Sequence, residues 1–176
     1  VSCEDLLRSL PADSQLHALG EQLAAQWWGL LPGVHRLSFE NGQVLLTLYI
    51  GPAQSMLRSQ QIVADSVYLD GFSPQKNPEL WSAEALKNIA RHCRRSTTLS
   101  TWCVAGEVRE ALKKLGFDVR KVPGVPPKRH NLQARYNPAW EPRHKTDDLP
   151  QALTSAASCI VIGAGLAGAA AAASLA

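Results

Sequence analysis

The sequence predicts an α/β fold, because strand-like and helix-like patterns alternate through the middle of the chain. In order, they occupy residues 66–70, 82–93, 97–104, 106–115 and 117–122. The short connections between them predict a largely parallel sheet, whose ligands lie beyond the carboxyl ends of its strands. Asp70 stands at such an end, and residues 125–136 are expected to finish in a further strand.

Local signals mark the ends of the two central helices. Ser82 is a suitable N-cap, and Glu84 lies where a carboxylate favours the positive end of a helix. Gly116 occupies the position after the second helix, where a left-handed backbone is common.

The first third of the chain is expected to form helices and a hairpin. Residues 4–31 have a helical pattern that breaks at Pro11, and Asp13 is suited to cap the second helix. Residues 34–50 read as a hairpin around Asn41-Gly42, a pair that suits the two positive φ angles of a type I′ turn. A short helix is expected at 53–61.

Composition limits the class of protein. A chain of 176 residues with 45% hydrophobic side chains suits one ordinary domain with a few dozen residues to spare. The four cysteines form no C-x-x-C pair, which argues against a zinc site or a disulfide scaffold and fits a reducing cytoplasm. We expect Cys103 in the core and His92 at the surface.

Charge is unevenly distributed, although the formal net charge is only +3. From Arg109 to Lys145 there are ten Lys and Arg residues against three acidic ones. Such a region suits contact with RNA, and a solvated surface is the alternative.

The last residues read as the start of a second domain. Residues 137–157 have the composition of a linker, and 158–176 show a short apolar run, a G-x-G-x-x-G motif at Gly163, Gly165 and Gly168, and an alanine-rich stretch. This pattern suits a dinucleotide turn better than a membrane helix, because the run is only weakly apolar. With Val1 at one end and an unfinished βαβ unit at the other, we interpret the chain as a piece of a longer polypeptide.

The segment from Leu69 to Trp81 carries a specific resemblance. Its pattern L-D-G-F-x-P-x-x-N-P-x-x-W is matched at Leu69, Asp70, Gly71, Phe72, Pro74, Asn77, Pro78 and Trp81. Residues 1–136 thereby resemble the later part of the methyltransferase domain of the bifunctional tRNA 5-methylaminomethyl-2-thiouridine biosynthesis proteins. The tail from 158 to 176 resembles the first βα unit of their FAD-dependent oxidase domain. The resemblance implies a class I, Rossmann-like methyltransferase sheet followed by an FAD-binding Rossmann domain.

It also implies a two-step modification of a wobble uridine in tRNA. FAD-dependent removal of a carboxymethyl group from 5-carboxymethylaminomethyluridine is followed by N-methylation with S-adenosylmethionine. Asp70 is the candidate that accepts or steers the amine proton, and a turn or cap is its alternative role. Phe72, Asn77, Pro78 and Trp81 are candidates to hold the uridine, although a tryptophan here equally suits the core.

Further roles follow for basic residues and glycines. Lys128 and Arg129 match a basic pair expected at tRNA phosphates, with plain solvation as the alternative. Gly163, Gly165 and Gly168 would approach the pyrophosphate of FAD. We expect tRNA as partner, no membrane, no metal and a cytoplasmic location.

The sequence departs from the family pattern in ways that bear on activity. The glycine-rich first loop and the acidic residue after the second strand would both precede Val1. Gly51-Pro52-Ala53 stands where the family has Gly-Asp-Ala, and proline cannot accept a hydrogen bond from the adenine amine. We expect the strand ending at Asp70 to have one unpaired edge. We also expect this chain alone to bind S-adenosylmethionine weakly or not at all, and not to bind flavin.

Two other functions remain open from the sequence. One is a non-catalytic RNA-binding remnant that kept the basic surface. The other is an FAD- or NAD-dependent oxidoreductase with an unrelated N-terminal extension.

Overall fold

The computed structural model describes residues 2–10, 15–27, 29, 31–60 and 62–141, and the structural statements below refer to these residues. Their elements in chain order are α1 (Cys3–Arg8), α2 (His17–Ala25), β1 (Gly33–Phe39), the 3₁₀ turn η1 (Glu40–Gly42), β2 (Val44–Ile50), α3 (Ala53–Ser59), β3 (Ala64–Leu69), α4 (Ala83–Ala90), β4 (Cys93–Thr101), α5 (Gly106–Lys114), β5 (Phe117–Pro123) and β6 (His130–Tyr136).

Four strands form one sheet in the order β3-β4-β6-β5. β3 and β4 run parallel, and β6 runs antiparallel to both of its neighbours. The expected α/β fold is therefore confirmed, but the expectation of a largely parallel sheet is wrong. The reason is the short connection between β5 and β6, which turns the chain back antiparallel to β5. β6 then lies between β4 and β5.

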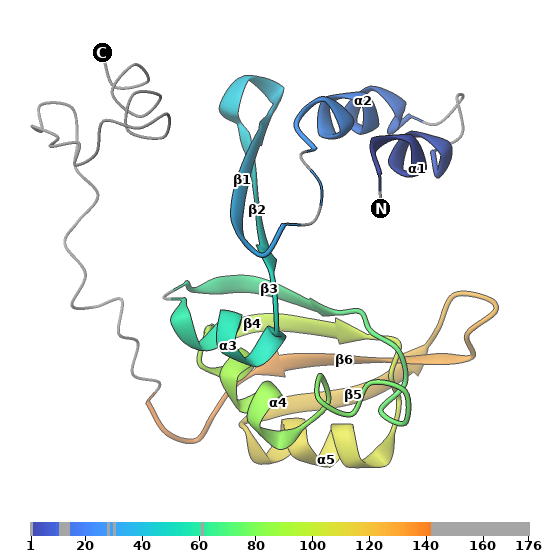
Figure 1. Cartoon of the computed structure of the whole chain (residues 1–176). Helices are drawn as coiled ribbons and strands as arrows, with labels where there is room; N and C mark the ends of the chain where they lie inside the picture. The colour runs from blue at the N-terminus through green and yellow to red at the C-terminus, as the bar shows by residue number, and fades with distance from the viewer. Residues whose placement is uncertain (1, 11–14, 28, 30, 61, 142–176) are drawn as a thin grey trace, which may run out of the picture. The chain divides into compact units, whose positions relative to one another are not determined.

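Helices α4 and α5 cover the same face of this sheet (Figure 1). The core between them contains one fully buried leucine from each of four elements: Leu86 of α4, Leu99 of β4, Leu112 of α5 and Leu132 of β6. The rings of Phe117 and Tyr136 pack with centroids 4.9 Å apart across β5 and β6. Burying these apolar side chains is the main force that holds the sheet to its two helices.

The helix ends agree with the local signals. The Ser82 hydroxyl accepts a hydrogen bond from the Ala85 backbone N–H at 3.2 Å, which confirms it as the N-cap of α4. Gly116 follows α5 with a φ of +92°, a conformation that glycine adopts without strain.

The hairpin is confirmed, and Asn41 and Gly42 have the two positive φ angles that were expected of its turn. Phe39 and Val44 form the last strand pair, so residues 40–43 connect the two strands. Glu40, Asn41 and Gly42 have φ angles of +51°, +55° and +86°. The Gln43 N–H donates to the carbonyl oxygen of Glu40 at 3.2 Å, which closes the expected turn around Asn41-Gly42.

The first helices are shorter than the pattern of residues 4–31 predicts. Ser2 and Asp5 form a capping box at α1. The N-cap of α2 is Leu16, which makes no side-chain capping bond, and the expected cap Asp13 lies outside the described residues. α2 ends at Ala25, ahead of Gly29, whose φ is +88°.

The two assumptions about burial have different outcomes. His92 is buried, not exposed, because its two ring nitrogens lie 2.9 and 3.1 Å from the carbonyl oxygens of Leu57 and Ile62. Cys103, which follows β4, is partly buried and packs against the hydrophobic core, so the expectation of a core residue is confirmed only in part.

Candidate functional site

The site begins where β3 and β4 end. Leu69 pairs with Thr101 as the last residue pair of this parallel ladder. Asp70 and Trp102 come directly after these two residues, so the chain brings both to the same edge of the sheet. Asp70 is exposed, and 44% of the Trp102 side-chain surface is accessible.

Trp81 holds the loop after Asp70 from the side of the hydrophobic core. Trp81 is buried, and its Nε1–H donates to the carbonyl oxygen of Phe72 at 2.6 Å. A Cβ at Gly71 would overlap the end of the Leu80 side chain and lie 3.8 Å from the Trp81 ring, so the loop packs closely against these two residues. The Phe72 side chain is left exposed.

A cavity of about 350 Å³ lies at this edge of the sheet. Three segments line it: the loop after β3, the residues after β4, and the loop between β5 and β6. Its lining residues are Gly71, Ser73, Pro74, Gln75, Trp102, Cys103, Val104, Ala105, Glu107 and Lys128. We call it the edge cavity.

The residues predicted to bind substrate do not all line the edge cavity. Lys128 lines the edge cavity, and Arg129 is exposed beside it in the chain. Pro78 is exposed and Asn77 half-buried, and neither contributes to the lining. Trp81 lies in the hydrophobic core, where it positions the loop.

Sequence reasoning did not single out Trp102, although part of the signal was present. Residues 66–70 and 97–104 were expected as strands joined by a helix, and such strands pair in parallel. Aligning the ends of these expected strands would have placed Val104 beside Asp70, and only the observed pairing of Leu69 with Thr101 places Trp102 there. The missing step was the register, which a sequence pattern alone does not give.

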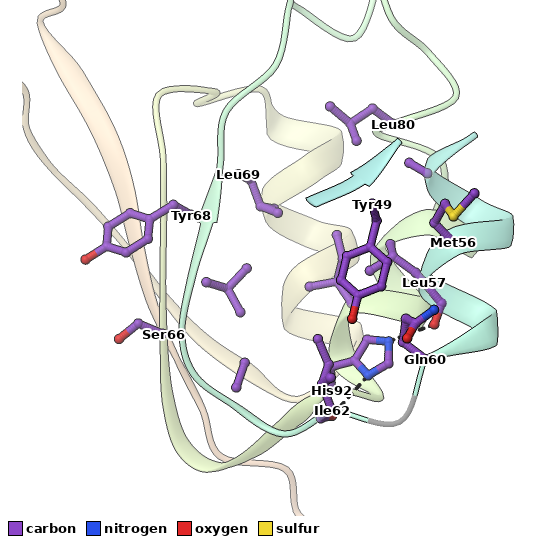
Figure 2. A pocket seen from close by; sticks show the side chains of 14 residues that line it. Tyr49, Met56, Leu57, Gln60, Ile62, Ser66, Tyr68, Leu69, Leu80 and His92 are labelled. Atoms are coloured by element: carbon purple, nitrogen blue, oxygen red, sulfur yellow. Dashed lines mark hydrogen bonds between the residues drawn. The ribbon is translucent and has the colours of Figure 1, made fainter. Parts of the chain in front are cut away.

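A second cavity, of about 360 Å³, lies along β3 (Figure 2). Apolar side chains of α3, β3 and α4 dominate its lining, with Tyr49 from β2. Figure 2 shows Leu69 pointing toward these side chains and Tyr68 on the opposite side of the strand. Ala53 lines it too, so the segment Gly51–Ala53 and the strand ending at Asp70 meet at this cavity.

Within the described residues, β3 pairs with β4 alone, which confirms the expected unpaired edge. The second cavity lies on this side and contains no carboxylate among its lining residues. Pro52 is the N-cap of α3 and has no side-chain acceptor. The ribose hydroxyls and the ammonium group of S-adenosylmethionine need hydrogen-bond acceptors, for which carboxylates are well suited. Because the second cavity has no carboxylate, its lining residues fit at most one side of an S-adenosylmethionine site.

The flavin site cannot be located in the structure, because Gly163, Gly165 and Gly168 lie outside the described residues. In the part of the chain that the structure covers, no group of three or more His, Cys, Asp or Glu side chains could hold a metal ion. None of its helices has the length and apolar character needed to cross a membrane.

Comparison with known proteins shows which proteins this chain is similar to. The chain is 65% identical over 177 residues to the tRNA 5-methylaminomethyl-2-thiouridine biosynthesis bifunctional protein MnmC of Acidovorax sp. (strain JS42) and 44% identical over 173 residues to that of Paraburkholderia phymatum. These alignments cover 100% and 97% of this chain but 28% and 26% of the relatives, so the chain spans little more than a quarter of their length.

A solved structure, that of MNMC2 from Aquifex aeolicus, matches with a TM-score of 0.60 at 25% identity, over 78% of this chain and 42% of the other. The resemblance to the bifunctional tRNA-modifying proteins is thus confirmed. Residues 14–137 match the family described as S-adenosyl-L-methionine-dependent methyltransferase, and the chain belongs to that family.

Proposed function

We propose that this chain forms the substrate side of a methyltransferase that methylates the amine of a modified wobble uridine in tRNA. The observation that carries the proposal is the edge cavity, which is lined by Trp102, by Lys128 and by Gly71, the residue after Asp70. Asp70 itself is exposed and does not line the cavity. An acid, an aromatic ring and a cation suit an amine, a base and a phosphate respectively. We take tRNA as the substrate because the names of the relatives give it as theirs.

Asp70 is the proposed proton acceptor. An amine attacks a methyl group through its nitrogen lone pair, so it must be unprotonated when the new C–N bond forms. S-adenosylmethionine supplies the methyl group and keeps the electron pair of the broken S–C bond. The nitrogen becomes positively charged in the same step, and the Asp70 carboxylate takes the proton that it then loses.

Lys128 and Arg129 are proposed to contact tRNA phosphates. Both are exposed and lie in the connection between β5 and β6. Contacts of this kind position an RNA without reading its sequence, and they weaken as salt rises.

For the longer protein we propose the preceding step as well. An FAD-dependent domain that begins near residue 158 would remove the carboxymethyl group and expose the amine. Gly163, Gly165 and Gly168 would approach the FAD pyrophosphate at a helix N-terminus.

A second candidate function is RNA binding without catalysis. It is favoured by Pro52, which replaces an acid in the family pattern, and by the lack of carboxylates around the second cavity. In that case the edge cavity would still bind RNA, but no methyl group would be transferred.

A chimera separates the two functions. The matching 28% of the Acidovorax relative would be replaced by this chain, and transfer of a radioactive methyl group from S-adenosylmethionine to undermodified tRNA would be measured. We expect transfer within about tenfold of the parent enzyme, about 1.4 kcal/mol. A folded chimera that binds tRNA without transfer supports the non-catalytic function. Recovery of transfer by Pro52→Asp would then trace the loss to that position.

A further inference from the structure

Trp102 stands out among the tryptophans of the described chain because it combines exposure with a place in a cavity. Its side chain is 44% accessible and lines the edge cavity, immediately after the strand that neighbours Asp70. A large aromatic ring left facing a cavity loses the stabilisation that burial would give. Such a ring is available to a ligand with a flat face.

The neighbouring aromatic residues are less suited to that role. Trp81 is 7% exposed, and its indole N–H is already bonded to the Phe72 carbonyl oxygen. Phe72 is exposed but does not line the edge cavity. Tyr68 lines the second cavity and not this one.

Lys128 brings a cation to the same cavity. Its loop is closed by two backbone hydrogen bonds, from Gly124 N–H to the Arg129 oxygen at 2.9 Å and from Lys128 N–H to the Val125 oxygen at 3.0 Å. A Cβ at Gly124 would lie 2.5 Å from the Lys128 carbonyl oxygen, so the turn is tight there. These contacts fix the backbone that carries the ammonium group.

Glu107, an exposed residue near the start of α5, also lines the edge cavity. A carboxylate disfavours a free anion but accepts hydrogen bonds from an amine or from the N–H of a base. The combination of an indole face, an ammonium group and a carboxylate therefore fits a whole nucleotide better than an isolated phosphate.

We propose that Trp102 is the residue on which the target base stacks, with the Lys128 ammonium on the phosphate of the same nucleotide. This inference rests on the proposed function and assigns its base-binding residue. Trp81, a candidate to hold the uridine on sequence grounds, is buried and does not offer its ring to a base.

The test uses the 176-residue chain and two short RNA hairpins. The hairpins are identical except that one carries uridine at the wobble position and the other an abasic nucleotide. Binding of each is measured by fluorescence anisotropy for the wild type and for the Trp102→Ala, Trp102→Phe, Lys128→Ala and Trp140→Ala variants. Trp140 is the matched control, because it is 50% exposed and lies outside the edge cavity.

We expect the wild type to bind the uridine hairpin about tenfold more tightly than the abasic one, as for one base–aromatic stack. Trp102→Ala should abolish this preference without changing the affinity for the abasic hairpin, and Trp102→Phe should retain most of it. Lys128→Ala should weaken both hairpins equally, and Trp140→Ala should change neither.

Two results would overturn the inference. If Trp102→Ala weakens both hairpins equally, or if the wild type shows no preference for uridine, Trp102 does not stack on the base. The proposed function survives these results, because its own test is methyl transfer by the chimera. Failure of the chain to bind either hairpin contradicts the inference and the proposed RNA contacts of Lys128 together.

Discussion

The indole Nε1–H of Trp81 donates a hydrogen bond of 2.6 Å to the carbonyl oxygen of Phe72, nine residues earlier in the chain. One ring thereby joins the hydrophobic core to the loop that follows Asp70. The indole explains why this loop takes a defined path over the sheet edge. Its role is to position the loop from within the core.

Trp81→Phe should loosen this loop. The substitution keeps an aromatic ring in the core but removes the donor, which leaves the Phe72 carbonyl oxygen without it. We expect the free energy of unfolding to fall by about 1–2 kcal/mol. Urea denaturation measures that loss, and hydrogen exchange should show faster exchange in residues 71–80. Trp102→Phe is the control and should change the stability by less than about 0.5 kcal/mol. Equal stabilities for the two variants would contradict this role of Trp81.

Arg95→Ala should release the segment after β6. The Arg95 guanidinium donates to the carbonyl oxygens of Pro138 at 2.9 Å and Trp140 at 3.0 Å, and to the Glu141 carboxylate at 3.1 Å. We expect a loss of about 1–2 kcal/mol and faster proteolysis near residues 137–141.

Its neighbour Arg94 provides the matched control. Arg94 pairs with Asp65 on the surface. Because exposed ion pairs contribute little, Arg94→Ala should cost less than about 1 kcal/mol. Equal destabilisation by Arg94→Ala and Arg95→Ala would contradict this role of Arg95.

Gly116→Ala should destabilise the corner between α5 and β5. The φ of Gly116 is +92°, and a Cβ there would lie 2.8 Å from the Pro138 Cβ and 2.9 Å from its Cα. The left-handed conformation alone costs alanine about 1–2 kcal/mol, and the close contact adds to it. Gly106→Ala is the control, because a Cβ there meets no atom within 4 Å. Thermal unfolding of both variants should show a lower Tm for Gly116→Ala only.

The Cys93 thiol should be unreactive in the native chain, and the stability that it contributes should be lost at high pH. Burial raises the pKa of its thiol to about 12, from a reference value of 9.0. Because the unfolded chain ionises this thiol first, its contribution to stability is complete below pH 9 and is lost as the pH rises toward 12. The stability advantage of the wild type over Cys93→Ala should therefore stay constant below pH 9 and shrink between pH 9 and pH 12.

Thiol labelling gives an independent measure of the same property. At pH 8 the native chain should react with a disulfide reagent at its exposed Cys3 before Cys93, which should become reactive only on unfolding. Rapid labelling of Cys93 in the native chain would contradict the burial.

Much of the fold could be predicted because it is encoded locally. Ser82 caps α4 through its own hydroxyl, and Gly116 ends α5 through its own φ angle, so each signal lies at the position that it determines. The placement of β6 between β4 and β5 depends on pairing between distant segments, and no local pattern specifies it.

The candidate site divides in the same way. The motif that contains Asp70 is contiguous in the sequence and could be recognised there. Trp102 and Lys128 join it through the strand register and a distant loop, so only the structure brings them together. Trp81 belongs to the motif, yet its burial makes it a positioning residue, a distinction that depends on packing.

Substitution of Asp70 in the chimera tests the central claim most directly. We expect Asp70→Asn to lower kcat for methyl transfer by about 10² to 10⁴, the contribution typical of a proton acceptor, while tRNA affinity stays unchanged. Asp65→Asn, five residues earlier in the exposed part of β3, should leave kcat unchanged. If Asp70→Asn transfers methyl groups as fast as Asp65→Asn does, Asp70 is not the proton acceptor and the proposed mechanism is wrong.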